Sequence, residues 1–195
     1  MLCRKGGLVT HRHDDVAAEW HRLCAKALTP TKVTDEPLIF TSRRFEEGQA
    51  TVQPAIRGER GDVGVHGFWH KHRTCIFDVR VTDLDCETNR SQAPLKVLTK
   101  HEKEKKDKYL QACLDRRRDF TPLAFSVDGM RGPETDRALN RLAELLAGKW
   151  NDEHSHVCAH VRAQMSIALA RTTGYCLRGA RDQRPIHHTL SLIHI

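Results

Sequence analysis

Three carboxylates and two lysines are spaced so that a folded chain could bring them together for chemistry on phosphodiesters. Asp62 begins one expected strand, Asp78 lies inside the next, and Glu102 lies on the helix that follows. Carboxylates that converge in this way bind hard divalent cations through oxygen, and a nearby cation stabilises the charge that develops on phosphate. Lys105 and Lys106 are the candidates for that cation.

Each of these residues also has an ordinary structural interpretation. Asp62 follows a glycine and suits a turn. Glu102 and Lys106 form a permitted i,i+4 pair on a helix surface, and the sequence leaves that interpretation open beside the catalytic one. Asp78 is harder to explain in this way, because aspartate is depleted in strand interiors and its neighbours are apolar. The catalytic hypothesis therefore depends on the three acids together.

Two strands, 62–69 and 74–83, are expected to form a hairpin around the polar turn 70–73. Because side chains alternate across a strand, Asp78 and Arg80 project from the same face of the second strand. Arg80 is therefore a candidate phosphate contact. The opposite face is apolar and consists of Cys75, Phe77, Val79 and Val81.

A long helix is expected from Pro94 to about Arg118, since proline is tolerated in the first turn. A step of about 100° per residue places Glu102 in the middle of its inward stripe, with Lys105 and Lys106 at the two sides. The stripe consists of Leu95, Leu98, Tyr109 and Cys113. A basic run suits non-specific phosphate binding or a solvated face, and consists of Lys100, Lys103, Lys108, Arg116, Arg117 and Arg118.

The remaining elements complete an α/β (α+β) pattern. A first helix is expected after Asp14 as N-cap and ends before Pro30. A strand at 120–127 precedes helices at 133–150 and 155–172. The order helix, strand, strand, helix, strand, helix, helix indicates a small mixed sheet flanked by helices, with a C-terminal helical pair.

Composition limits the class of protein. With 195 residues and 39% hydrophobic content, the chain can form one domain with a substantial core. Lys and Arg outnumber Asp and Glu by 32 to 25, which favours polyanionic partners. No apolar run approaches the length of a membrane span, and the seven scattered cysteines suit free thiols, so an intracellular protein without a membrane partner is expected.

Ordered motifs run through most of the chain, from Cys3 to about Arg181. They are RGDVGVHGFW at 60–69, CIFDVRVTD at 75–83, HEKEKKDKYL at 101–110, FTP at 120–122, SVDG at 126–129 and LRG at 177–179. Together they resemble the C-terminal part of retrotransposon (non-LTR-type) reverse-transcriptase polyproteins from microbial eukaryotes. Such regions look like restriction-endonuclease-like domains, which carry a Cys/His knuckle, an Arg-His-Asp segment and a PD-(D/E)xK-type core.

The resemblance carries over onto particular positions of this sequence. The segment 12–14 matches Arg-His-Asp, Asp62 matches the first acid of the core, and Asp78 matches the second. Gly61 stands in place of the motif's proline, and Arg80 stands where many such nucleases have lysine. A lysine from the long helix would then supply the cation, and the candidates are Lys105, Lys106 and Lys108.

The function that this resemblance implies is metal-dependent nicking of target DNA for reverse transcription. Asp62 and Asp78 would bind Mg²⁺ or Mn²⁺, with Glu102 assisting. The implied partners are the DNA target, element RNA and the polymerase domain of the parent polyprotein, in the nucleus. A catalytically inactive remnant that binds nucleic acid is the alternative, and a structural tail without independent function is a third hypothesis.

Zinc is not expected in this chain. Cys3, His11 and His13 look like only the end of the knuckle, too few for a four-ligand site. The histidines of 154–160 and Cys158 fall on different faces of a helix and are interpreted as solvated side chains.

The expected organisation has four parts. An N-terminal segment with the remnant knuckle and first helix spans 1–30, and a flexible linker or loop spans 31–61. The endonuclease-like domain with its C-terminal helices spans 62–181. The tail 182–195 is doubtful, and 190–195 has the sequence of a translated sequencing adapter.

Overall fold

A four-stranded mixed sheet forms the centre of the protein in the computed structural model, which describes residues 7–42 and 57–179. The strands lie in the order β1-β4-β5-β6, and β1 pairs with β4, and β4 with β5, in antiparallel fashion. β5 and β6 are parallel. The bounds are Val33–Asp35 for β1, Val63–His66 for β4, Thr74–Thr82 for β5 and Asp119–Ser126 for β6. The predicted hairpin is thereby confirmed, although its first strand ends at His66 and not at Trp69.

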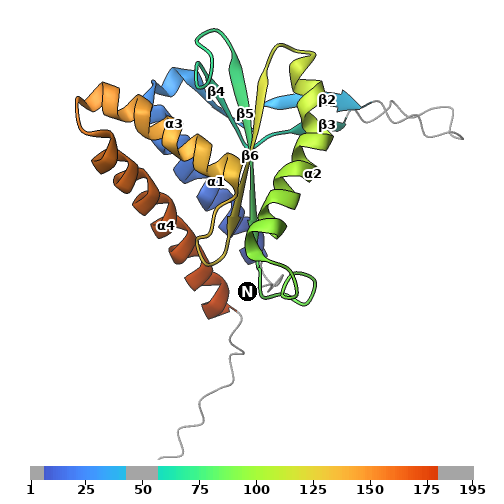
Figure 1. Cartoon of the computed structure of the whole chain (residues 1–195). Helices are drawn as coiled ribbons and strands as arrows, with labels where there is room; N and C mark the ends of the chain where they lie inside the picture. Colours follow the sequence, from blue (N-terminus) through green and yellow to red (C-terminus); the bar gives the residue numbers. More distant parts are fainter. Residues whose placement is uncertain (1–6, 43–56, 180–195) are drawn as a thin grey trace, which may run out of the picture.

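Helices cover both faces of this sheet, as Figure 1 shows. α2 (Pro94–Leu114) lies on one face and makes the crossover between the parallel strands β5 and β6. α1 (Leu8–Ala27), α3 (Pro133–Trp150) and α4 (His154–Gly179) lie on the other side. The described chain is therefore mixed α/β, with a small mixed sheet flanked by helices, as the sequence predicted.

The alternation predicted for β5 decides which helix each residue meets. Phe77 and Val79 join the main core with side chains of α1, α3 and α4, while Ile76 packs with Tyr109 of α2. Asp78 and Arg80 share the α2 side, because both form ion pairs with residues of that helix. The period of two along the strand thus places an acid and a base beneath α2.

The long helix is shorter than predicted, and one residue of its predicted inward stripe is exposed. It begins at Pro94 but ends at Leu114 rather than near Arg118, and Arg117 has a φ of 54°, which no helix residue adopts. Leu98, Tyr109, Cys113 and Glu102 are buried as predicted. Leu95 is 53% exposed, which corrects its place in the inward stripe. Leu95 lies in the first turn of α2, where the helix extends beyond the part of the sheet that it covers.

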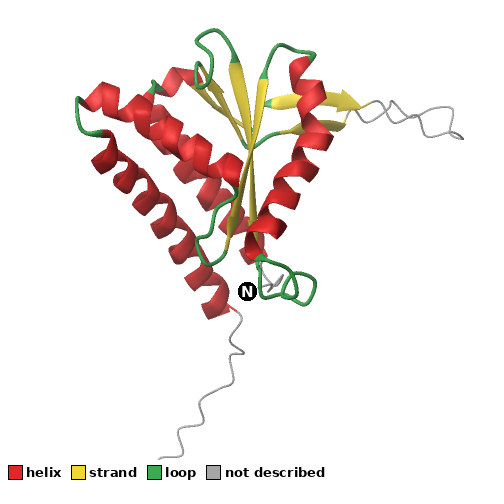
Figure 2. Cartoon of the chain, viewed as in Figure 1, coloured by secondary structure: helices red, strands yellow, loops and turns green. Residues whose placement is uncertain are grey.

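The segment 31–61 is not a simple linker. β1 pairs with β4, and β2 (Leu38–Ser42) pairs with β3 (Arg57–Arg60) in a second sheet beside α2 (Figure 2). Val33 and Ile39 are buried. Strands this short show no sustained hydrophobic period. They form because they pair with other strands, and composition does not reveal that pairing. Residues 43–56 of the predicted loop lie outside the described part.

α1 is an integral part of the core and not a separate segment. Val16, Trp20 and Leu23 are fully buried against the sheet and neighbouring helices. The helix begins at Leu8, with Gly7 as N-cap at a φ of 71°, so Asp14 lies within it and is not the predicted N-cap. The bounds predicted for α3 are confirmed, while α4 extends beyond the predicted 155–172. The tail 182–195 lies outside the described residues.

Among the described helices, none combines the length and apolar character that a membrane crossing requires. The cysteines of the described part are free thiols, as predicted, and all but Cys86 are buried.

Candidate active site

Asp62 and Asp78 are neighbours at the point where β4 begins against β5. Asp62 immediately precedes β4, and its backbone N–H donates to the Phe77 carbonyl over 2.9 Å. The next pair in the register joins Val63 to Phe77. Asp78 follows Phe77 in β5, and its pKa is raised chiefly by burial and to a smaller extent by the negative charge of Asp62. The strand pairing thus brings the two residues close along the chain register, while convergence of their carboxylates on one metal ion stays a prediction.

Asp62 accepts hydrogen bonds from two elements. Its Oδ2 lies 3.1 Å from Nε2 of His13 on α1 and accepts the backbone N–H of Val79 at 2.5 Å. His13 Nδ1 lies 3.1 Å from Asp14 Oδ1. The hydrogen bond to Asp62 is the largest influence on His13 and, against partial burial, raises its pKa to about 9. His13 is therefore a cation at neutral pH, held against the first acid.

His13 is the functional candidate that sequence reasoning did not assign to this site. The sequence placed it in the Arg-His-Asp segment and in the end of a Cys/His knuckle. The match of His13 to that segment was the sequence feature that marked it as functional. No pattern near His13 indicated its partner Asp62, which lies 49 residues away. His11 is exposed on the same helix, and Cys3 lies outside the described residues.

Asp78 faces Lys105 of α2. The Nζ of Lys105 lies 2.6 Å from Asp78 Oδ2, and the two side chains are 27% and 7% exposed. Burial raises the pKa of Asp78, and the charge of Lys105 acts in the opposite direction. A carboxylate oxygen can accept more than one hydrogen bond, so the buried Oδ2 retains acceptor capacity beside Lys105. A buried acid beside one cation is thus the centre of the site.

The other helix lysines have different partners. Lys106 Nζ lies 2.8 Å from Glu134 on α3, and Lys108 Nζ lies 3.2 Å from Glu59 on β3. Of these three lysines, Lys105 is the one that reaches an acid of the Asp62–Asp78 pair. Its position at the side of the α2 stripe, where the sequence placed it, lets the long side chain reach down to the sheet.

Glu102 is buried, as predicted, but its bonds go to the start of α3. Its carboxylate accepts the backbone N–H groups of Glu134 and Thr135 and the Thr135 hydroxyl, each over 3.2 Å. Burial raises the pKa of Glu102, and these hydrogen bonds oppose that rise. Any side chain at position 132 would collide with the carboxylate, so Gly132 is required there. Glu102 therefore anchors α3, a structural role that competes with its predicted catalytic one.

The predicted phosphate-binding residues are partly engaged in ion pairs. Arg80 lies 2.9 Å from Glu104, and Lys100 approaches the same carboxylate at 4.0 Å. Arg118 donates to the Leu38 carbonyl over 2.7 Å. Lys103, Arg116 and Arg117 are also exposed. The basic run thus forms a surface along and beyond α2. Near its start Lys100 approaches Glu104, and at its end Arg118 is bound to a backbone carbonyl.

The histidine-rich start of α4 forms no metal site. His160 packs edge-on against Trp150 with ring centroids 5.5 Å apart, and Cys158 Sγ lies 3.5 Å from Asn140 Oδ1. Throughout 7–42 and 57–179, no group of three or more His, Cys, Asp or Glu side chains is arranged to hold a metal ion. Mg²⁺ often takes one or two carboxylates and completes its shell with water and substrate phosphate. The Asp62–Asp78 pair fits that limited requirement.

No family model, curated protein or solved structure matches this chain. The function has to be argued from the geometry of the site and from the residues that carry the resemblance.

Proposed function

We propose that this chain is a metal-dependent DNA-nicking module, the restriction-endonuclease-like C-terminal part of a retrotransposon reverse-transcriptase polyprotein. The observation that carries the proposal is the buried Asp78 held 2.6 Å from Lys105, beside Asp62 on the adjoining strand. Two acids at the inner strands of a sheet, with one cation from the covering helix, are the residue types that phosphodiester hydrolysis requires.

Each side chain has a distinct role in this hypothesis. Asp62 and Asp78 are the residues that would hold Mg²⁺ or Mn²⁺, which supplies Lewis-acid activation of phosphate and water when bound. Lys105 carries the positive charge that stabilises the pentacovalent phosphate. His13, protonated on Asp62, orients that carboxylate and adds a second positive charge at the mouth of the site.

The fold supports a PD-(D/E)xK-type core. The first acid precedes one strand of an antiparallel pair, the second acid lies inside its partner, and a helix that carries the lysine crosses to a parallel strand. The absence of the motif's proline has a local reason. The N–H of Gly61 donates to the Pro37 carbonyl over 3.0 Å, and a side chain there would collide with Ile76. Proline has no N–H to donate and would also require that space.

A second function is favoured by one specific observation. Each acid already has a cationic partner, Asp62 with His13 and Asp78 with Lys105. An ion pair of this kind can neutralise the acid without any metal, as in a catalytically inactive remnant that binds DNA or RNA through the basic surface of α2. Both hypotheses give the chain the same partners: target DNA, element RNA and the parent polymerase, in the nucleus.

Nicking of supercoiled plasmid by the purified chain, with Mg²⁺ or Mn²⁺ and with EDTA, separates the two hypotheses. The decisive variant is Asp78→Asn, and Asp107→Asn on the exposed side of α2 removes the same charge elsewhere. We expect metal-dependent nicking that Asp78→Asn abolishes and Asp107→Asn retains. Salt-sensitive DNA binding without nicking, equal in all three proteins, would establish the inactive remnant instead.

A further inference from the structure

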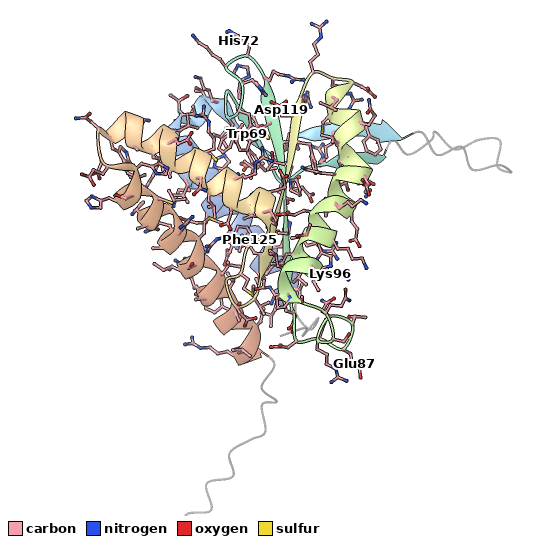
Figure 3. The ribbon with its side chains drawn as sticks, in the orientation of Figure 1. Trp69, His72, Glu87, Lys96, Asp119 and Phe125 are labelled. Atoms are coloured by element: carbon pink, nitrogen blue, oxygen red, sulfur yellow. The ribbon has the colours of Figure 1, made fainter. Side chains whose placement is uncertain are left out.

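A second site lies at the outer edge of the sheet, where α2 and α3 diverge over β6. A pocket of about 390 Å³ opens there, within the size range of ligand sites. Among residues 7–42 and 57–179, β6 is the last strand of the sheet, and an isolated bridge joins its Phe125 to Arg131 on this outer edge. Figure 3 shows Trp69 and Asp119 together at this end of the sheet, away from Glu87 and Lys96 at the other. The pocket uses none of the acids of the proposed active site.

The floor of the pocket is apolar and contains a fixed aromatic ring. Trp69, Leu110, Leu114 and Phe120 line it. The indole N–H of Trp69 donates to the Thr121 hydroxyl over 2.9 Å, and Phe68 packs edge-on against the ring at 5.1 Å. A ring held at both ends loses little freedom when a flat ligand stacks on it.

The cationic rim of the pocket consists of Lys106 and Arg137, with His70 beside them. Lys106 and Arg137 share the Glu134 carboxylate at 2.8 and 3.2 Å. His70 and Arg73 share the Asp119 carboxylate at 2.9 and 3.1 Å. Among the lining residues, Lys106 and Arg137 balance the charges of Glu134 and Asp119. Arg73 contacts Asp119 without lining the pocket and adds one further permanent cation beside it.

We propose that this pocket binds one nucleotide of an unpaired nucleic-acid strand, with the base on Trp69 and the phosphate on the cationic rim. Aromatic stacking beside positive charge is the combination with which proteins hold single strands. The inference rests on the proposed function and extends it, because Lys105 reaches the acid pair while the next residue, Lys106, lines the pocket. A strand that crosses α2 would therefore occupy both sites.

Binding of a fluorescein-labelled oligothymidylate in EDTA, followed by anisotropy, tests the assignment without cleavage. The informative variant is Leu114→Glu, because Leu114 lines the pocket and is 41% exposed, so folding tolerates the change. Leu95→Glu, at the other end of the same helix and 53% exposed, is the matched control. We expect the Kd to rise roughly ten-fold or more in Leu114→Glu and to stay unchanged in Leu95→Glu.

Tryptophan fluorescence gives a second, local measurement. Thymidine monophosphate should quench the parent chain and Trp150→Phe equally, and this quenching should disappear in Trp69→Phe, with folding followed by circular dichroism. Trp150 is exposed on α3 and is not among the residues that line the pocket. Quenching that survives in Trp69→Phe, or equal oligonucleotide affinity in Leu114→Glu and the parent, would overturn the pocket assignment and leave the outer edge of β6 for a protein segment.

The two proposals fail in distinguishable ways. Metal-dependent nicking with unaltered oligonucleotide affinity in Leu114→Glu retains the nuclease and rejects the pocket. Pocket-dependent binding without nicking retains the pocket and favours the inactive remnant. A parent chain that neither nicks nor binds nucleic acid contradicts both proposals.

Discussion

Lys105 and Asp78 form a close ion pair between α2 and β5, with 2.6 Å between Nζ and Oδ2. The pair joins the crossover helix to the strand that it covers, and Asp78 is almost entirely buried there. Removal of one partner would leave a buried charge without compensation, so this pair is both a structural tie and the centre of the proposed chemistry.

Lys105→Gln is predicted to reduce nicking at least about 100-fold, the usual cost of losing one group that stabilises transition-state charge. It should also lower the free energy of unfolding by about 1–3 kcal/mol, because the carboxylate of Asp78 loses its cation. Plasmid nicking and urea titration measure the two effects. Lys96→Gln, exposed in the first turn of α2, removes the same charge and should behave like the parent. Equal nicking by the two variants would exclude Lys105 from the chemistry.

Glu102→Ala is predicted to destabilise the fold by about 1–3 kcal/mol, because the N–H groups of Glu134 and Thr135 lose their buried acceptor. Thermal unfolding checks this, with Glu87→Ala in the exposed loop before α2 as the charge-matched control. The rate of nicking per folded molecule should stay near that of the parent. A large fall in rate at unchanged stability would instead support the catalytic role that the sequence assigned to Glu102.

Much of this arrangement is visible in periodicity. The period of two in 74–83 placed Asp78 and Arg80 under a helix, and the helical step placed Glu102 in a buried stripe. The partners of a buried carboxylate cannot be predicted from periodicity, because they depend on which helix end packs against the carboxylate. The sequence therefore found Glu102 but not its partner Thr135, which lies 33 residues later.

Long-range contacts explain the other differences. His13 meets Asp62 because α1 packs beside the sheet, and no local pattern encodes that approach. The strand containing Val33 is only three residues long and has the composition of a loop. It forms because Val33 pairs with Val65, a contact that the composition of the segment does not reveal. Lys105 could not be chosen over Lys106 from the sequence, because both lie at the sides of one stripe and only the packing of α3 gives Lys106 its own acid.

The His13–Asp62 pair predicts a pH dependence of stability. The pKa of His13 is raised from 6.5 to about 9 in the folded chain, so the folded state binds more protons than the unfolded state between these values. The contribution of His13 to the free energy of unfolding should be fully present below 6.5 and be lost as pH rises through this window.

Urea titration of the parent and His13→Gln in EDTA measures this contribution as a difference between the two proteins. Burial also raises the pKa of the Cys24 and Cys75 thiols, and unfolded thiols begin to ionise above about pH 8. The comparison is therefore made below that pH. We expect the parent to lose more stability than His13→Gln over this range, and parallel curves would contradict the ion pair.

Two glycines are predicted to respond in opposite directions to alanine. At Gly61 a Cβ would collide with Ile76 beneath the strand, so Gly61→Ala should cost about 1–3 kcal/mol of the free energy of unfolding. At Gly148, inside α3, a Cβ meets nothing within 4 Å, so Gly148→Ala should stabilise by about 0.5–1 kcal/mol through helix propensity. Thermal unfolding of both variants measures the difference. If Gly61→Ala is as stable as the parent, position 61 has room for a side chain, and the steric part of the explanation for the missing proline fails.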